Sequence, residues 1–343
     1  MTPRLRLCTL GAGYFSQFHY RAWARIAEVE LVGICDRNAA AAQKVAAGFP
    51  QVRIYGDLAT MLDVERPDLL DIIVPPAGHP DAIRAAAERG IAMICQKPFC
   101  GALGAAEAAT ALAERHETPL IVHENFRFQP WYEQLAQVLA SGRLGQIYNA
   151  TFRLRPGDGQ GPDAYLDRQP YFRDMERLLI HETGIHLVDV FRSLFGEVEA
   201  VSARLRRLNS AIRGEDAALV TLEMSNGTLA TLDANRLSDH AATNKRLTMG
   251  EMLIEAENGS ISLDGNGEIR LRDHGALTSS RIDYAWTDND FGGDCVYRTQ
   301  AAAVAAIQGG TTPVNTARDY LTNLRIEEAI YASHNQGRRI VLS

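Results

Sequence analysis

Two glycines and one acidic residue near the start of the chain have the spacing of a site that could bind a pyrophosphate and a ribose. Gly11 and Gly13 lie directly after a short apolar run and before residues with helical spacing. Gly11 permits a tight turn, and Gly13 lets the backbone approach a pyrophosphate, whose charge a helix N-terminus stabilises. Asp36 follows about twenty residues later, where a carboxylate that accepts ribose hydroxyl groups belongs. The pattern predicts a dinucleotide site.

The glycine motif is incomplete, because Ser16 stands where a third glycine is usual. A structural turn without a ligand therefore stays an alternative. Asp36 favours NAD, since a carboxylate repels the 2′-phosphate of NADP. Arg37 leaves NADP open, because a guanidinium at that position could bind the phosphate. Tyr14 and Phe15 lie within the motif, and we expect them to contact the cofactor as well.

A lysine follows a predicted strand later in the same half of the chain. Gln96, Lys97 and Pro98 stand at its carboxyl end, the edge where open α/β sheets place their ligands. A lysine there could hydrogen-bond a substrate hydroxyl and stabilise the alkoxide that develops on it. Pro98 would fix the backbone, for example through a cis peptide bond. The alternative is an exposed, solvated lysine, which the spacing alone does not exclude.

A third candidate group lies in the second half of the chain, between His181 and His186. In an α-helix, Glu182 and His186 are one turn apart on the same face, whereas His181 lies about 140° from His186. A carboxylate beside an imidazole orients it and raises its basicity, which suits removal of a hydroxyl proton near neutral pH. The alternative is a histidine that belongs to the apolar core of its helix.

The first of two regions has to position the glycines and the lysine. From residue 5 to 122, short β-rich apolar runs alternate with alanine-rich stretches of helical spacing, which predicts an α/β fold with a doubly wound parallel sheet. The predicted strands cover residues 5–10, 31–35, 70–74, 91–95 and 120–122. The predicted helices cover residues 39–49, 81–89 and 102–116, after a first helix that ends at Trp23.

After Pro130 the alternation of short apolar runs with alanine-rich helical stretches ends, and the pattern of the sequence changes. A helix to residue 139 precedes an extended segment at 146–154, and residues 177–194 are expected to form one long helix. Further strands are predicted at 201–205, 218–224, 229–234, 252–256 and 269–271, and closing helices at 296–307 and 317–332. This pattern predicts a largely antiparallel sheet with one covered face. We expect two domains, at residues 1–126 and 127–343.

The bulk composition indicates a small-molecule partner. The chain has 343 residues and a formal net charge of −7, without a run rich in lysine or arginine, which argues against a nucleic-acid surface. Its five cysteines show no zinc-ligand spacing, so we expect reduced thiols and no metal. With no leader-like stretch before the first strand and no spanning segment later, we expect a cytoplasmic protein without a membrane partner.

These segments, together with several further markers, resemble the Gfo/Idh/MocA oxidoreductases along essentially the whole chain. The further markers are Pro75-Pro76 with His79, Asn125-Phe126-Arg127-Phe128, Gly184-Ile185-His186 with Asp189, and Gly292-Gly293-Asp294. The resemblance implies a Rossmann domain that binds NAD, and an α/β domain with a large, mostly antiparallel open sheet. It also implies a homodimer or homotetramer formed through that sheet.

By the same resemblance, Lys97 matches the catalytic lysine of the family and His186 its catalytic histidine. Two positions depart from the family pattern. Gln96 stands where glutamate is common, which removes a charge beside Lys97 but keeps an acceptor oxygen. Glu182 stands where sugar-oxidising members often carry aspartate, so one methylene changes its reach toward the substrate.

The resemblance also implies residues that contact the ligands. Pro75 and His79 are expected to flank the nicotinamide end of the cofactor, with Gln96 close by. Asn125, Arg127 and Arg173 are expected to meet substrate oxygens. Surface salt bridges are an alternative for the two arginines.

The function implied is an NAD-dependent dehydrogenase that oxidises a hydroxyl of a sugar or related polyol. His186 takes the hydroxyl proton, Lys97 hydrogen-bonds the reacting oxygen, and Glu182 holds the imidazole or a neighbouring hydroxyl. Within the family, residues 11–23 and 181–186 are most similar to D-apiose dehydrogenase-like proteins, which oxidise an aldose to its lactone. Two other functions stay open: a non-catalytic NAD- and sugar-binding transcriptional sensor, and an enzyme that recycles tightly bound NAD.

Overall fold

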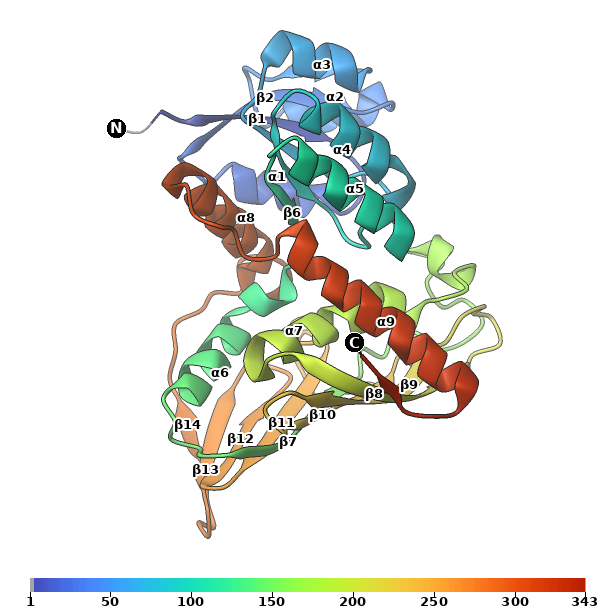
Figure 1. The fold of residues 1–343 in the computed structure, drawn as a ribbon, viewed down its shortest axis with the longest axis vertical. Helices are drawn as coiled ribbons and strands as arrows, with labels where there is room; N and C mark the ends of the chain where they lie inside the picture. Colours follow the sequence, from blue (N-terminus) through green and yellow to red (C-terminus); the bar gives the residue numbers. More distant parts are fainter. Residues whose placement is uncertain (1–2, 343) are drawn as a thin grey trace. The chain divides into compact units, whose positions relative to one another are not determined.

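The computed structural model describes residues 3–342, which form two compact units. Unit 1 comprises the chain up to Asn125 together with Cys295–Thr322, and unit 2 comprises Phe126–Asp294 together with the chain from Asn323 onward. Helices α8 (Phe291–Gly309) and α9 (Ala317–Gln336) therefore contribute residues to both units. Figure 1 labels the elements of each unit along the chain. No helix within the described residues is long and apolar enough to cross a membrane.

Unit 1 is built on a six-stranded parallel sheet with the strand order β3-β2-β1-β4-β5-β6. All residues of the central strands β4 and β5 are buried, as expected for a parallel sheet covered on both faces. The strands are β1 (Leu5–Leu10), β2 (Val29–Cys35), β3 (Arg53–Tyr55), β4 (Leu69–Ile72), β5 (Ala92–Cys95) and β6 (Leu120–Val122). The helices between them are α1 (Ser16–Trp23), α2 (Ala39–Ala46), α3 (Leu58–Glu65), α4 (His79–Ala87) and α5 (Leu103–Arg115).

One core cluster of unit 1 joins segments that are far apart in the sequence. Leu7, Leu69 and Ile94 of the central strands pack with Trp23 of α1 and with Val304 of α8. Helix α8 therefore covers the same face of the parallel sheet as α1. The late return of the chain to unit 1 completes a hydrophobic core that the first 125 residues leave open.

The order of the strands places three of their carboxyl ends side by side. The sheet grows in one direction from β1 through β2 and in the other through β4, so β1, β4 and β5 are consecutive neighbours. In open α/β sheets, ligands bind at the carboxyl ends beside such a reversal. Gly11 directly follows β1 with a φ of +115°, and a Cβ atom at this position would lie 3.0 Å from the carbonyl carbon of Ile73. Glycine is needed at this turn.

Unit 2 is built on a nine-stranded sheet with the order β14-β13-β12-β11-β7-β10-β9-β8-β15. All of its strand pairs are antiparallel except the pair β7 and β10. The strands are β7 (Ile147–Leu154), β8 (Val198–Arg206), β9 (Ala217–Met224), β10 (Leu229–Asn235), β11 (Gly250–Ala256), β12 (Gly259–Leu263), β13 (Ile269–Asp273), β14 (Ser280–Ile282) and β15 (Ile340–Val341).

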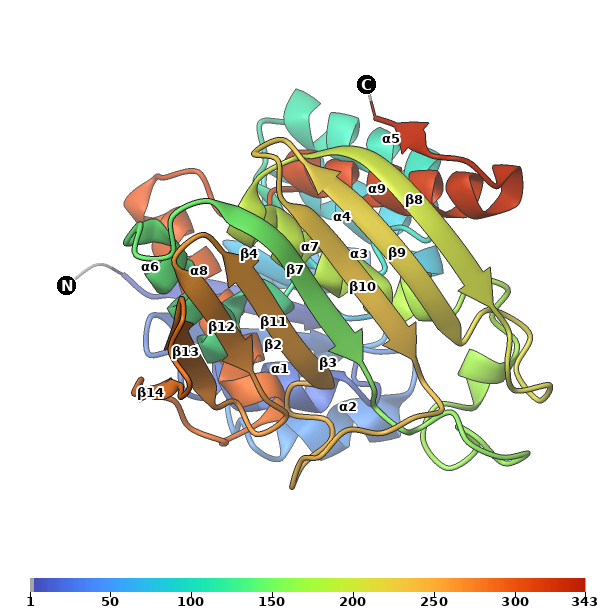
Figure 2. The same ribbon diagram turned by 90° about the horizontal axis from the view of Figure 1, so that it is seen from below.

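Helices cover one face of this sheet, and the other face carries none of the described helices (Figure 2). The core joins the inward residues of the strands with α6 (Pro130–Ala140), α7 (Ile185–Phe195) and the second half of α9. In β9, Val220, Leu222 and Met224 are buried, whereas Thr221 and Glu223 between them are partly exposed. This alternation is the signature of a sheet with one covered face.

The predicted fold class is confirmed in both units, and the individual elements differ from the prediction in several places. Strand β3 and helix α3 were not predicted, because β3 has only three residues, two of them exposed and one partly exposed. The short strands β12, β14 and β15 were not predicted either. The long helix expected at 177–194 is wrong in its first part, since Leu179–Gly184 forms a π-helical turn before α7. We expected a single change of domain after residue 126, whereas Cys295–Thr322 returns to unit 1.

A buried carboxylate links three elements of unit 1. Glu65, at the end of α3, is 2% exposed and accepts hydrogen bonds from Arg53 at 2.7 Å and from Tyr55 at 2.6 Å, both in β3. Arg6 of β1 donates to the same carboxylate at 3.0 Å. Burial by itself would raise the pKa of Glu65, but the bonds from Arg53 and Tyr55 outweigh it and lower the pKa below its ordinary value.

The substitution Glu65→Gln is expected to lower the free energy of unfolding by about 1–3 kcal/mol at neutral pH, because three hydrogen-bond donors lose their charged acceptor. A carboxylate with a lowered pKa in the folded state stabilises the fold above its unfolded-state pKa, and this stabilisation is lost as the pH falls through the folded-state pKa. Urea unfolding at a series of acidic pH values should show that the free energy of unfolding falls more steeply with decreasing pH in the unsubstituted protein than in the variant. Equal losses would contradict this role of Glu65.

Candidate active site

The glycine turn and the acidic residue predicted with it lie together in unit 1. The N–H of Gly11 donates to the carbonyl oxygen of Cys35, which joins the ends of β1 and β2. The Asp36 carboxylate accepts the N–H of Ala12 at 2.7 Å and, through its other oxygen, the N–H of Asn38 at 2.7 Å. Asp36 is therefore held against the glycine turn, whereas Arg37 beside it is exposed.

The space in front of the turn is open. A Cβ atom at Gly13 would meet no atom within 4 Å, so the backbone there is accessible to a ligand. Ser16, which replaces the third glycine, donates its hydroxyl to the carbonyl oxygen of Gly13 at 2.7 Å and stabilises the turn. Tyr14 is half exposed, and the ring of Phe15 packs against that of Phe18 at 5.1 Å.

The loop after β4 contains the next predicted residues. Pro75 is exposed, but His79 is completely buried. The Nε2 of His79 donates to the carbonyl oxygen of Val74 at 2.9 Å, and its Nδ1 accepts the N–H of Cys100 at 3.2 Å. Burial lowers the pKa of His79 to about 4, so the ring is neutral at physiological pH. This ring ties together the loops that follow β4 and β5, with both nitrogens engaged by the protein.

Lys97 lies directly after β5, at the same edge of the parallel sheet as the glycine turn. Its side chain is partly exposed, and the peptide bond between Lys97 and Pro98 is cis. Gln96 before it is buried, and its carbonyl oxygen Oε1 accepts the backbone N–H of Lys97 at 3.0 Å. The amide of Gln96 is thus used inside unit 1, where it holds the peptide that carries the lysine.

In unit 2, His186 lies in the first turn of α7. Its ring is 4% exposed and stacks on the ring of Phe126, with centroids 3.9 Å apart and planes 4° from parallel. Such stacking fixes the plane of the imidazole. Phe126 is one of the residues that the family resemblance singled out, but no role was predicted for it.

Glu182 lies one turn before α7, in the π-helical segment. Glu182 is four residues before His186, and the chain passes from the π-helix Leu179–Gly184 into α7 between them. The Glu182 carboxylate accepts the hydroxyl of Thr183 at 2.6 Å, and Nη1 of Arg236 lies 3.6 Å from it. Arg236 is 1% exposed and also donates to Asp158 at 2.9 Å.

Sequence reasoning missed Arg236. Burial by itself would lower the pKa of its guanidinium, but the charge of Asp158 raises it, so the group stays charged. The ring of Tyr165 lies 5.3 Å from it, which adds a cation–π contact. Residues Asp158 and Tyr165 belong to a loop rich in glycine and proline, and Arg236 ties this loop to Glu182. No pattern in the sequence distinguishes this arginine from a surface residue.

The three predicted substrate-binding residues have different environments. In unit 2, Arg127 donates two hydrogen bonds to the buried Asp189, at 2.7 and 2.6 Å, so it anchors α7. Arg173 is partly exposed and forms no ion pair with any residue that the structure describes. In unit 1, Asn125 is 3% exposed, and its Oδ1 accepts no hydrogen bond from residues 3–342.

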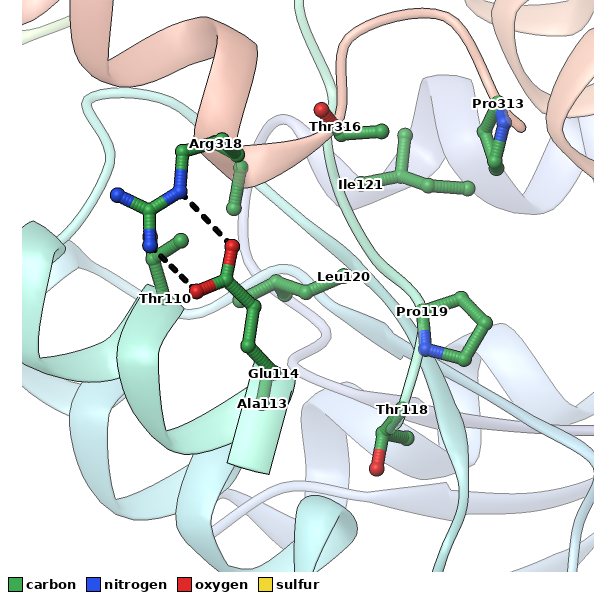
Figure 3. Close-up of a pocket in the computed structure, with 11 residues that line it drawn as sticks. Thr110, Ala113, Glu114, Thr118, Pro119, Leu120, Ile121, Pro313, Thr316 and Arg318 are labelled. Atoms are coloured by element: carbon green, nitrogen blue, oxygen red, sulfur yellow. Dashed lines mark hydrogen bonds and ion pairs between the residues drawn. The ribbon is translucent and has the colours of Figure 1, made fainter. Parts of the chain in front are cut away.

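A hollow of about 220 Å³ in unit 1 lies elsewhere, at the amino end of β6 (Figure 3). Arg318 and Glu114 form an ion pair across it, and the hydroxyl of Thr110 donates to the carbonyl oxygen of Ala106. Since ligands of open α/β sheets bind at the carboxyl ends of strands, this hollow is not the predicted site. Within the described part of the chain, no group of three or more His, Cys, Asp or Glu residues could hold a metal ion.

Both units match profiles of a single protein family. Residues 5–124 match the profile described as the oxidoreductase family with an NAD-binding Rossmann fold, and residues 132–262 match the GFO/IDH/MocA C-terminal domain. The resemblance inferred from the motifs is confirmed. Unit 1 is the NAD-binding Rossmann domain of this family.

Two curated relatives match nearly the whole chain. A D-apiose dehydrogenase of Paraburkholderia graminis is 32% identical and covers 99% of this chain and 90% of its own length. A D-apiose dehydrogenase of Rhizobium rhizogenes is 29% identical and covers 98% of this chain and 97% of its own length. The similarity to this branch, expected from two short segments, extends over the full alignment.

Solved structures share the fold of the whole chain. An oxidoreductase from Agrobacterium radiobacter in complex with NAD+, L-tartaric acid and magnesium is 27% identical, with a TM-score of 0.88 over 98% of both chains. A levoglucosan dehydrogenase in complex with NADH and levoglucosan is 18% identical, with a TM-score of 0.84, and shows the shared fold alone. Together with the near-complete match to the first relative, the two profiles show that this chain belongs to the Gfo/Idh/MocA family of oxidoreductases.

Proposed function

We propose that the protein is an NAD-dependent dehydrogenase that oxidises a hydroxyl of a sugar or a related polyol. One observation carries the proposal: the glycine turn, the Pro75 loop and Lys97 follow β1, β4 and β5, which are consecutive neighbours in the parallel sheet. A phosphate-binding turn and a cationic side chain that can hold a reacting oxygen are thereby placed along one edge.

The residues of unit 1 fit NAD. The open space at Gly13 leaves room for a pyrophosphate near the start of α1. Asp36 accepts one backbone N–H through each oxygen, and a carboxylate has about four lone-pair sites, so it can also accept ribose hydroxyl groups. When bound, NAD supplies the hydride acceptor, the C4 atom of the nicotinamide.

The protein's own residues then handle the proton and the charge. His186 removes the proton of the substrate hydroxyl, with its ring plane set by the stack on Phe126. The ammonium group of Lys97 donates a hydrogen bond to the same oxygen and stabilises the negative charge that grows on it. Because Thr183 and Arg236 hold Glu182, we assign its carboxylate to a neighbouring hydroxyl of the substrate.

The substrate we favour is an aldose, oxidised at its anomeric hydroxyl to a lactone, with D-apiose as the first candidate. The support is the relationship to two D-apiose dehydrogenases over nearly the whole chain. Asn125 and Arg173 offer polar groups that suit a molecule with many hydroxyl groups.

The direct test is NADH formation, followed by absorbance, with NAD and a panel of aldoses that includes D-apiose, inositols and sugar acids. One sugar should give NADH, and Lys97→Ala and His186→Ala should each lower kcat roughly 10²–10⁴-fold, because each removes a group that acts on the reacting oxygen. Lys44→Ala and His274→Ala are matched controls at exposed positions and should change nothing. NAD that binds without being reduced by any member of the panel would favour a sensor or an enzyme that recycles its cofactor.

The role of Asp36 predicts the choice between NAD and NADP. Asp36→Ala should lower kcat/KM for NAD roughly 10–100-fold, because the ribose hydroxyl groups lose a charged acceptor. The ratio of kcat/KM for NAD to kcat/KM for NADP should fall as well. Asp36→Asn removes the negative charge but keeps an acceptor for the N–H of Ala12. A loss of activity with NAD in this variant is therefore caused by the missing carboxylate and not by collapse of the glycine turn. An unchanged preference in both variants would show that Asp36 does not contact the ribose.

We also propose that two or four copies associate through the uncovered face of the nine-stranded sheet. Three exposed apolar residues point to that face, namely Leu219 on β9, Leu229 on β10 and Leu253 on β11, each next to buried residues that point to the core. A sheet face that mixes exposed apolar residues with polar ones suits an interface between copies.

Sedimentation velocity is expected to give a dimer or a tetramer for the unsubstituted protein. Leu253→Glu should shift the distribution toward monomer, because it buries a charge in the interface. Leu277→Glu, at a fully exposed position outside the uncovered face, is the control. A monomer before any substitution, or a shift with the control alone, would contradict the proposal.

The location we propose is the cytoplasm. All five cysteines are free and buried, and burial raises the pKa of the Cys8 thiol to about 12. Free thiols are the rule in a reducing compartment.

A further inference from the structure

A cluster of buried polar side chains adjoins the peptide that carries Lys97. Asp71, in the middle of β4, and His19, on α1, are completely buried, and Gln96 is 6% exposed. Asp71 interrupts an otherwise apolar strand, which is unusual for the centre of a parallel sheet. Neither Asp71 nor His19 takes part in the proposed chemistry.

Short contacts connect these side chains in a line. Nδ1 of His19 lies 2.7 Å from Oδ2 of Asp71, which also accepts the indole N–H of Trp23 at 2.7 Å. On the other side of the ring, Nε2 of His19 lies 2.7 Å from the amide nitrogen of Gln96. The carbonyl oxygen of Gln96 then accepts the backbone N–H of Lys97 at 3.0 Å. The line runs from the sheet centre to the lysine.

The donors along this line can be assigned from one fixed point. A backbone N–H can only donate, so the N–H of Lys97 requires the oxygen of Gln96 on its side. The amide NH₂ of Gln96 must then face His19, and Nε2 of His19 must accept. The proton of His19 is therefore on Nδ1, where Asp71 accepts it. Each hydrogen bond determines the direction of the next.

Two further side chains contact this group, His123 and Gln300. The ring of His123 lies beside that of His19, with centroids 4.3 Å apart, and its Nδ1 is 3.4 Å from the Gln96 nitrogen, within reach of the second amide hydrogen. The amide nitrogen of Gln300 on α8 lies 3.0 Å from Nδ1 of His19, while the buried amide oxygen of Gln300 accepts no hydrogen bond from the described residues. The assignment therefore requires a half-turn of the Gln300 amide, which sets its oxygen toward the N–H of His19. A half-turn of Gln96 would instead set its NH₂ against the N–H of Lys97.

We propose that His19 is a positioning residue for Lys97. As a neutral imidazole protonated on Nδ1, it orients the Gln96 amide, which in turn fixes the peptide from which the lysine side chain departs. A glutamate at position 96 would present a carboxylate oxygen to Nε2 of His19, which would then have to carry a proton. The effect on catalysis rests on the proposed function, whereas the protonation state of His19 does not.

The first test is the ¹⁵N NMR spectrum of the histidine rings in the full-length protein. We expect His19 to have a protonated Nδ1 and an unprotonated Nε2, and Gln96→Glu to make both nitrogens protonated. The resonances of His19 are assigned by their loss in His19→Leu or, if that variant does not fold, by their change in Gln96→Glu. A proton on Nε2 in the unsubstituted protein would overturn the proposal.

The second test separates positioning from stability. Gln96→Met keeps the length of the side chain but removes both amide groups, and kcat with the oxidised sugar should fall roughly 10²-fold, because misplacing a catalytic group by about 1 Å has that effect. His19→Leu should show a similar fall, and the double variant no further one, since both substitutions break the same line of contacts. Losses that multiply, or that change KM alone, would overturn the proposal.

Thr110→Val is the matched control, because it removes a buried hydroxyl that donates to the carbonyl oxygen of Ala106 in the same unit. It should lower the free energy of unfolding and leave kcat unchanged. If no sugar is oxidised by the unsubstituted protein, the proposed function fails, while the ring protonation of His19 still decides the assignment of donors on which the positioning rests.

Discussion

The structure of unit 1 depends on a carboxylate at the centre of a parallel sheet. Burying a carboxylate is unfavourable unless it is hydrogen-bonded, and Oδ2 of Asp71 has two such partners, the side chains of His19 and Trp23, whereas its buried Oδ1 has none among the described residues. Both donors lie on α1, the helix that begins just after the glycine turn. Through these bonds, β4 sets the position of α1 on the sheet. The amino end of this helix and the peptide of Lys97, which is reached through Gln96, are therefore held by one group.

Unit 2 uses buried charges in the same way. Asp189 accepts two bonds from Arg127 and one from Asn323 of α9, which holds α7 between neighbouring segments. Arg236 joins the loop at Asp158 to Glu182 in the π-helical turn. A buried ion pair is strongly destabilising when one partner is removed, so each such group restricts the conformations open to the segments it joins. The side chains proposed to contact substrate are thus supported by groups that do not.

The sequence predicted the elements whose signals are local. Gly11, Gly13 and Asp36 could be found because strand, turn and helix follow each other directly, and the alternation in β9 revealed its buried face. The partners of His19 could not be found, because His19 and Asp71 are far apart in the chain and only the strand order brings them together. The π-helical turn Leu179–Gly184 could not be predicted, because its residues are equally compatible with an α-helix. The return of Cys295–Thr322 to unit 1 has no local signal.

The reaction proposed for this chain is the transfer of a hydride from a sugar carbon to NAD. The most direct measurement uses an aldose deuterated at its anomeric carbon, incubated with NAD and the protein, followed by mass spectrometry of the nicotinamide and the sugar product. We expect deuterium at C4 of the nicotinamide in an amount equal to that of the lactone formed. Lactone without deuterium in the nicotinamide, or NADH that carries only solvent hydrogen, would contradict the proposed reaction.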